Sequence, residues 1–272
     1  MHVSNQPAVR SVQDGYEPVL LAAGAQASVL GAQLFGVLDA LDGSGSLRRA
    51  LTDPARPGDA KAGLVEGLLT GKVDGRVVSL LQELVRLRWS SERALLDAIE
   101  RLAVISVLAA AQSEGALERV EDELFRFDRV LVHQRELRQA LTDRRATPSQ
   151  RGALVHDLLG AGRVHAATLQ LVERAAVAPR ARSTAAWTGS VLGLAAERRE
   201  VLMAEVTAAV PLTAVQVQRL TAVLERTYGR PVSVQVAVEP DVIGGLRVQV
   251  GPELVDTTVL ARLDDVRRRL AG

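Results

Sequence analysis

The chain has 272 residues, no cysteine and a formal net charge of +1, and only 3% of its residues are aromatic. The absence of cysteine excludes disulfides, a thiol nucleophile and a thiolate metal site. Nucleic-acid-binding proteins usually carry a surplus of basic residues, and single-strand binders add stacking aromatic side chains. Neither feature is present, so nucleic acid is not an expected partner.

Membrane segments are not expected either. No apolar stretch approaches the roughly 20 residues that a membrane-spanning helix needs, and the most apolar run, Leu102–Ala111, is short. The N-terminus lacks the basic cluster and apolar core of a secretory signal. We therefore expect a soluble chain on the cytoplasmic side, which associates with a membrane only through partners.

Residues 16–106 predict a series of short helices, because apolar residues recur there at helical spacing. Turns are predicted at Asp42–Ser46, at Pro54–Gly58 and at Gly71–Gly75, where glycine and proline interrupt the period. The same order of helices is expected over residues 107–198. There Thr147 is a predicted N-cap, because Pro148 and Gln150 follow it as the first and third helical residues.

An internal repeat explains this similarity. Residues 34–69 return at 124–159 with a constant offset of 90 and no gap, most clearly where Leu47–Asp53 matches Leu137–Asp143. The positions retained are mostly apolar. A duplication that keeps its buried positions is a repeated packing unit, which indicates a protein that presents surfaces and not a single active site.

After about residue 200 the spacing of apolar residues changes from a helical period to the alternation of a strand. Strands are predicted at Glu205–Val210, Val232–Val238 and Leu246–Val250, because β-branched residues alternate there with other residues. A helix is expected to begin at a capping box formed by Thr213 and Gln216 and to end at Gly229. A last amphipathic helix is expected to turn four apolar residues inward, namely Val259, Leu263, Val266 and Leu270.

These patterns predict a mostly α-helical chain with a C-terminal α/β module. The expected domains are a first helical bundle over residues 1–106, a second, duplicated bundle over 107–198 and a small mixed α/β domain over 199–272. Each is within the usual size range of a domain.

Gly244-Gly245 is the only sequence that suggests a phosphate-binding loop. Such a loop needs a helix after its glycines and usually a lysine, whereas a strand is predicted here. We interpret the pair as a tight backbone turn. The four histidines lack the spacing of a helical zinc pair. No catalytic residue, metal site or cofactor is predicted.

Surface features could bind partner helices. Apolar grooves are predicted near leucines in both copies, although core packing is the alternative interpretation for each; these residues are Leu34, Leu38, Leu64, Leu68, Leu124, Leu154 and Leu158. Four acidic residues are expected on one helix face, either solvated or in contact with a basic helix: Glu118, Glu121, Asp122 and Glu123.

The C-terminal part resembles the delta subunit of F-type ATP synthases, the family of the oligomycin-sensitivity-conferring protein (OSCP). Three stretches carry the resemblance: Val206–Thr213, Tyr228–Arg230 and Val238–Gly251. The last includes the signature turn, made of Pro240, Asp241, Ile243, Gly244 and Gly245, and has Glu239 where the family usually has Asp. The ordinary subunit has one helical bundle, so the two copies here resemble the longer actinobacterial versions.

The resemblance implies a non-catalytic stator subunit. In this family the helical bundle grips N-terminal helices of the alpha subunits, and the C-terminal domain holds the b-subunit stalk, so that the catalytic head does not turn with the rotor. The chain would then lie at the cytoplasmic face of the plasma membrane. Two alternatives are a helical scaffold or adaptor outside the synthase and a nucleotide-binding enzyme that uses Gly244-Gly245.

Overall fold

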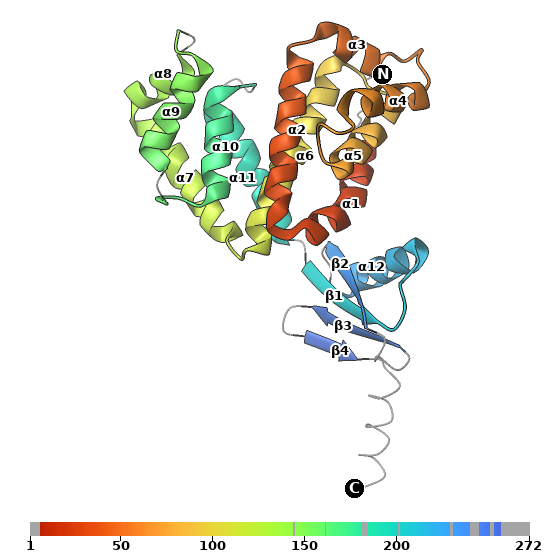
Figure 1. Ribbon diagram of the computed structural model, residues 1–272. Helices are drawn as coiled ribbons and strands as arrows, with labels where there is room; N and C mark the ends of the chain where they lie inside the picture. The colour runs from red at the N-terminus through yellow and green to blue at the C-terminus, as the bar shows by residue number, and fades with distance from the viewer. Residues whose placement is uncertain are drawn as a thin grey trace, which may run out of the picture. The chain divides into compact units, whose positions relative to one another are not determined.

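The computed structural model confirms a mostly helical chain with a small C-terminal α/β module (Figure 1). It describes residues 6–143, 145–160, 162–180, 184–200, 202–228, 231–239, 245–250 and 253–256. The chain forms two compact units, Met1–Ala196 and Glu197–Gly272. We call them the helical unit and the C-terminal unit and describe each by itself.

The first half of the helical unit contains seven helical segments, of which one is a single 3₁₀ turn. They are α1 (Gln6–Ala23), η1 (Gly24–Gln26), α2 (Ala27–Asp42), α3 (Gly45–Thr52), α4 (Gly58–Leu69), α5 (Gly75–Arg86) and α6 (Glu92–Ser113). The central pair is α2 and α6, which lie side by side along their length (Figure 1). Gly31 allows this approach, because a Cβ there would lie 2.8 Å from the carbonyl oxygen of Ala103.

The second half repeats this order. Its helices are α7 (Leu117–His133), α8 (Arg135–Thr142), α9 (Pro148–Leu159), α10 (Ala166–Val177) and α11 (Thr184–Glu200). The predicted cap of α9 is confirmed: Thr147 Oγ1 accepts from the Gln150 amide at 3.2 Å, and Gln150 Oε1 accepts from the Thr147 amide at 2.8 Å. Two of the amide donors that a helix start leaves free are satisfied in this way.

The duplication is present at the level of whole elements. The bounds of α8 and α9 lie 90 residues after those of α3 and α4. The offset becomes 91 beyond them, since Gly71 and Gly162 occupy the same turn with φ angles of 77° and 74°. Only glycine adopts such angles without strain. One residue has therefore been inserted between the end of α9 and Gly162.

One helix belongs to both repeats. Ala23 ends α1 and Ser113 ends α6, again 90 residues apart, so the second half of α6 is the counterpart of α1. In the first repeat α6 contacts α1, α2, α3 and α5, and in the second it contacts α7 and α10. The expected boundary between residues 106 and 107 falls inside this unbroken helix. The division into a first and a second bundle therefore stays a prediction in which α6 is shared.

A single apolar core runs through the helical unit, from Val12 in α1 to Ala195 in α11. One stretch of the described chain, Pro7–Asp42, is long and apolar enough to cross a membrane by length and composition alone. The 3₁₀ turn η1 interrupts it, and α1 and α2 bury residues such as Leu20 and Leu34 in the core. Only 33% of the most apolar window is buried. The expectation that no apolar stretch is long enough to span a membrane was therefore wrong for the length and composition of this stretch.

The C-terminal unit is a four-stranded mixed sheet with one helix, as far as its described residues show. Its elements are β1 (Leu202–Ala208), α12 (Ala214–Tyr228), β2 (Val232–Val238), β3 (Leu246–Val250) and β4 (Glu253–Asp256). The strand order is β2-β1-β3-β4. β1 is parallel to β2 and antiparallel to β3, and β3 is antiparallel to β4. A small core of valines lies between the sheet and Leu224 of α12.

Most sequence predictions for this unit are confirmed, with two corrections. The predicted capping box begins α12, since Thr213 Oγ1 accepts from the Gln216 amide. The first strand starts at Leu202 and ends at Ala208, earlier than the predicted Glu205–Val210. Strand β4 was not predicted, because four residues are too few to show an alternating pattern. The predicted helix with Val259 and Leu270 lies outside the described residues.

Candidate partner-binding site

The predicted groove leucines of the first repeat differ in accessibility. Leu34 and Leu38 of α2 are fully buried in the core. Leu64 of α4 is partly buried and packs against that core. Leu68, one turn later, is 36% exposed. A partner helix could therefore touch Leu68 directly. The two α2 leucines are core residues, which was the alternative to a groove position in the sequence analysis.

The second repeat shows the same gradation at equivalent positions. Leu124 of α7 is fully buried, Leu154 of α9 is partly buried, and Leu158 is 39% exposed. The duplication thus preserves one exposed leucine at the end of α4 and at the end of α9. These two leucines are the accessible part of the predicted grooves.

Further exposed apolar residues were not predicted. Phe125, Val130 and Val132 are exposed on α7, and Val29 is exposed on α2. The periodicity of a helix predicts which apolar residues share a face, and it does not predict that these four side chains are exposed. Their exposure depends on which elements cover each helix, and sequence spacing does not report that.

The predicted acidic face of α7 is divided in the structure. Asp122 pairs with Arg126 on the helix surface. Glu123 instead turns inward, where it accepts from Thr168 Oγ1 at 2.6 Å and from the His165 amide at 2.8 Å. Burial raises the pKa of this carboxyl, but these hydrogen bonds and the ion pair with Arg119 together outweigh burial, so the net pKa is lowered. Glu123 therefore holds the start of α10.

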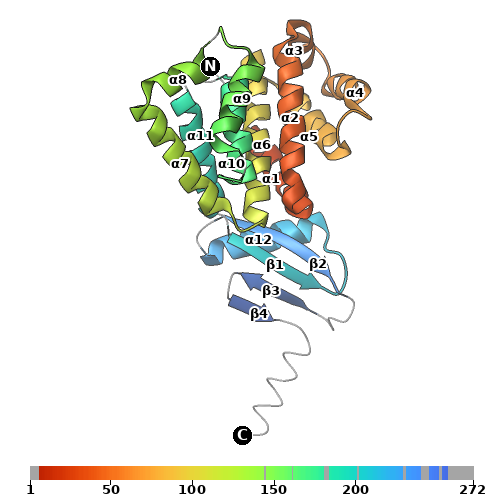
Figure 2. The same ribbon diagram turned by 60° about the vertical axis from the view of Figure 1, so that its left-hand side comes forward.

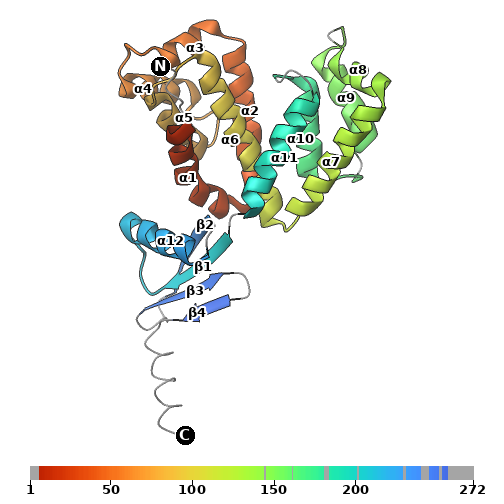
Figure 3. The same cartoon turned by 180° about the vertical axis from the view of Figure 1, so that it is seen from behind.

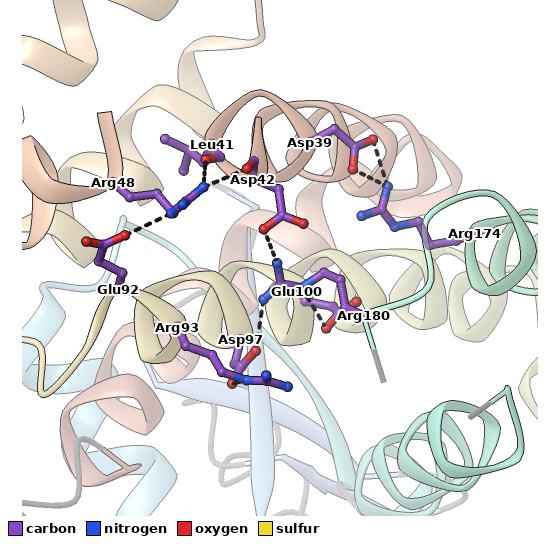
Figure 4. Close-up of polar contacts among 10 residues, drawn as sticks. All are labelled: Asp39, Leu41, Asp42, Arg48, Glu92, Arg93, Asp97, Glu100, Arg174 and Arg180. Atoms are coloured by element: carbon purple, nitrogen blue, oxygen red, sulfur yellow. Dashed lines mark hydrogen bonds and ion pairs between the residues drawn. The ribbon is translucent and has the colours of Figure 1, made fainter. Parts of the chain in front are cut away.

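A buried arginine joins the two repeats. Arg174 of α10 reaches α2, where its guanidinium lies 2.8 Å from Asp39 (Figure 4). The same guanidinium lies 4.8 Å from the centre of the Phe35 ring. Phe35 is only 5% exposed. A cation over an aromatic face is attracted by the negative potential of the ring, more strongly where water is excluded. We call the α2 face with Phe35, Asp39 and Asp42 the joint face.

A second arginine completes the joint. Arg180, which follows α10, lies 2.9 Å from Asp42, 3.0 Å from Asp97 and 3.5 Å from Glu100 (Figure 4). Its side chain is 10% exposed. Burial raises the pKa of Glu100 even though Arg180 lowers it. One cation of the second repeat thus meets carboxylates from both α2 and α6 of the first repeat.

The end of α2 is fastened within its own repeat. Arg48 of α3 donates to the carbonyls of Leu41 and Asp42 at 2.8 Å and 2.6 Å and pairs with Glu92 of α6 (Figure 4). These bonds satisfy carbonyls that a helix end leaves free. They also hold Asp42 in place for Arg180, so the joint face is preorganised.

The signature turn lies largely outside the described residues, including Pro240, Asp241, Ile243 and Gly244. Gly245 is described and has a φ angle of 102°, which favours glycine. Strand β3 begins at the next residue, Leu246. A phosphate loop would lead into a helix, so this position fits a backbone turn.

Histidines and carboxylates do not gather into a metal site in the described parts of the chain. His156 lies 3.3 Å from Glu173, and His165 lies 3.0 Å from Glu114. Each is a single pair between neighbouring segments of the second repeat. The described residues instead form ion-paired contacts between the repeats and exposed apolar helix faces.

Comparisons with known proteins show which family the chain is similar to. The model of the ATP synthase delta (OSCP) subunit family matches residues 104–270, from the middle of α6 into the C-terminal unit. The ATP synthase subunit delta of Beutenbergia cavernae is 52% identical over all 272 residues and over its own whole length. That of Streptomyces coelicolor is 44% identical over 100% of this chain and 99% of its own.

A solved structure also matches. It is a chain of the cryo-EM structure of the Toxoplasma gondii mitochondrial ATP synthase hexamer, 19% identical over 62% of this chain and 95% of that one. The TM-score of 0.29 is too low for an argument about the fold. The family match over more than half of the chain and the full-length relatives are sufficient: the chain belongs to the ATP synthase delta (OSCP) subunit family.

Proposed function

We propose that this chain is the peripheral-stalk (stator) subunit that links the alpha subunits of the F1 head to the b-subunit stalk. It carries out no chemistry. By holding the head against the torque of the rotor, it couples proton flow to ATP synthesis. It lies at the cytoplasmic face of the plasma membrane and is associated with the membrane only through the complex.

The observation that carries this proposal is the family match over residues 104–270 together with the two separate cores of the chain. Two units that each have their own core can each hold a different partner. Gripping two partners of one complex raises the effective concentration of each contact, so dissociation under load is slow.

The second repeat is the better candidate for the contact with alpha. The family match begins within α6 and therefore includes the second repeat but little of the first. We propose that residues 107–198, with α6 as a shared wall, hold an alpha N-terminal helix. Residues 1–106 brace that bundle through the joint, and residues 199–272 hold the b subunit.

Deletion of the chain tests the function as a whole. Inverted membrane vesicles without it are expected to retain ATP hydrolysis but to lose ATP-driven proton pumping, which a pH-sensitive dye reports. Addition of the purified chain is expected to restore pumping. Unchanged proton pumping in vesicles that lack the chain would end the proposal.

The assignment of the repeats can be tested with single cysteines, because the chain has none of its own. Leu68→Cys and Leu158→Cys are equivalent positions with nearly equal exposure, at 36% and 39%. A thiol-reactive peptide of the alpha N-terminus is expected to label Leu158→Cys preferentially. Preferential labelling of Leu68→Cys would assign the alpha contact to the first repeat instead.

A further inference from the structure

Arg180 has more carboxyl groups around it than one positive charge can neutralise. Its two terminal nitrogens donate to Asp42 and Asp97 at 2.9 Å and 3.0 Å, and its Nε lies 3.5 Å from Glu100 (Figure 4). We call these four residues the joint cluster. The cation comes from the second repeat and the three carboxyl groups come from α2 and α6 of the first. With all three ionised, the cluster would carry an excess of negative charge.

Glu100 is the carboxyl of the joint cluster that water reaches least. Its side chain is 17% exposed, whereas those of Asp42 and Asp97 are each 51% exposed. Its Oε1 is buried and has no hydrogen-bond partner among the described residues, and Arg180 Nε is too distant for a hydrogen bond to the other oxygen. An unpartnered buried oxygen costs less in a neutral carboxyl than in a carboxylate. A proton on Glu100 therefore removes the excess charge at the lowest cost.

The groups that face Glu100 belong to both repeats. Asp97 lies about one turn before it on α6, Arg174 and Arg180 bring positive charge from the second repeat, and Trp187 of α11 hydrogen-bonds to it. Burial is the largest influence and raises the pKa of Glu100, and Asp97 raises it further. The two arginines and Trp187 lower it, but the net pKa is raised. The burial depends on the second repeat, because Arg180 and Trp187 lie against the carboxyl.

The joint cluster lies where the second repeat meets the first. Helix α10 is the part of the second repeat that faces α2 and α6, and α8 lies on the far side (Figures 2 and 3). Gln170 of α10 donates to the Ser28 carbonyl at 3.2 Å, and Arg174 and Arg180 form the ion pairs of the joint. Movement of α10 away from α2 would expose Glu100 to water.

We propose that the contact between the repeats is a proton-linked latch, in which Glu100 binds a proton when α10 docks on the first repeat and releases it when α10 moves away. Low pH closes the latch and rising pH opens it. In the open state the exposed carboxyl ionises near pH 4.3, about where glutamate ordinarily does. From there up to the raised pKa of the closed state, the ratio of open to closed molecules rises by up to about tenfold per pH unit.

The latch is a property of the chain by itself and does not rest on the proposed function. Hydrogen exchange of the full-length chain, measured by mass spectrometry from pH 5 to pH 8, tests it. Glu100→Gln is the reference, because glutamine has the shape of the protonated carboxyl but cannot ionise. Comparing the two chains at each pH cancels the chemical pH dependence of exchange.

We expect the amides of α10 to open more often than those of the core helix α2, which stays folded when the latch opens. The ratio of α10 opening in the wild type to that in Glu100→Gln should rise by up to about tenfold per pH unit and then level off.

Three results would overturn the proposal. A ratio that stays flat would show that docking binds no proton. A ratio that falls with pH would show that attraction to Arg180 outweighs burial. Opening of α10 that equals that of α2 at every pH would show that the helical unit unfolds as a whole and that the repeats do not separate.

Asp97→Asn tests the charge balance of the cluster. It removes a negative charge that raises the pKa of Glu100 and leaves Arg180 with one carboxylate fewer. The total rise of α10 opening between pH 5 and pH 8, measured against Asp97→Asn with Glu100→Gln, should fall by about threefold or more. Glu83→Gln changes an exposed carboxyl of α5 and should leave the rise unchanged. An undiminished rise in Asp97→Asn would contradict the proposal.

Discussion

Lys61 and Arg151 occupy the same position in the two repeats, and both are buried with their charged ends at the C-terminal end of the following helix. Lys61 donates to the Leu87 carbonyl at 3.2 Å, while Arg151 donates to the carbonyls of Ala176 and Val177 at 2.7 Å and 3.1 Å. Cations are favoured there because the last carbonyls of a helix are unsatisfied and carry partial negative charge.

We expect Arg151→Ala to lower the free energy of unfolding by about 3 kcal/mol, because it leaves several buried carbonyls without donors. Arg151→Lys should cost about half as much, since the first repeat shows that a lysine reaches this site. Urea denaturation measures both. Equal losses in the two variants would mean that packing of the long side chain, and not its charge, is what the site requires.

Gly31 and Gly36 of α2 provide a matched pair for the packing of α2 on α6. A Cβ at Gly31 would lie 2.8 Å from both the Ala103 carbonyl oxygen and a Val107 methyl, whereas nothing lies within 4 Å of one at Gly36. We expect Gly31→Ala to destabilise by about 2 kcal/mol through overpacking. Gly36→Ala should stabilise by about 0.5–1 kcal/mol, because alanine restricts the unfolded chain. Thermal unfolding of the two variants tests the contrast.

Removal of Arg180 and removal of Arg93 should show how much more a buried ion pair contributes to stability than an exposed one. Arg180→Met leaves Glu100 buried without its cation, so we expect a loss of about 3 kcal/mol. Arg93 pairs with the same Asp97 at 3.6 Å but is 72% exposed, and Arg93→Met should cost less than about 0.5 kcal/mol. Denaturant titration compares the two. Similar losses would show that Arg180 does not hold the repeats together.

Glu100 should make stability depend on pH. Its pKa is raised in the folded state because it is buried. At pH values below the unfolded pKa of about 4.3 both states are protonated. As the pH rises from there through the raised pKa, the unfolded state ionises first and folded stability is lost.

Glu100→Gln cannot ionise, so its stability relative to the wild type should increase over that pH range and level off above it. Unfolding experiments from pH 4 to pH 8 measure this difference. A difference that shrinks with increasing pH would mean that attraction to Arg180 outweighs the cost of burial.

The elements that the sequence predicted well are those with local signals. Thr147 and Gln150 define the start of α9 within four residues, and Gly71 stands at a turn that requires a positive φ angle. The length of α6 was not predicted. Its apolar run continues through Ser106 without a break, and expecting one domain per repeat placed a boundary there.

Whether an apolar side chain is buried or exposed depends on contacts with residues that are distant in the sequence. Phe35 and Phe125 both follow a leucine at equivalent positions of the repeat, yet Phe35 is buried, with Arg174 over its ring, whereas Phe125 is exposed. The joint was missed for the same reason, since no periodicity links Asp39 to Arg174. The duplication itself contained one usable signal, the change from Asp39 to Arg129, because the ion pair that Asp39 forms with Arg174 cannot form at an arginine.

The shared helix α6 has a mechanical consequence. Two bundles joined by a flexible loop would move apart under tension as the loop extended. Here the connection is a continuous helix of 22 residues. Force applied to one repeat passes to the other along backbone hydrogen bonds that are shielded by both. Removing either repeat would also remove part of the packing of the other, because α6 belongs to both. The duplication therefore lengthened one continuous helical unit and did not add a second, independently linked bundle.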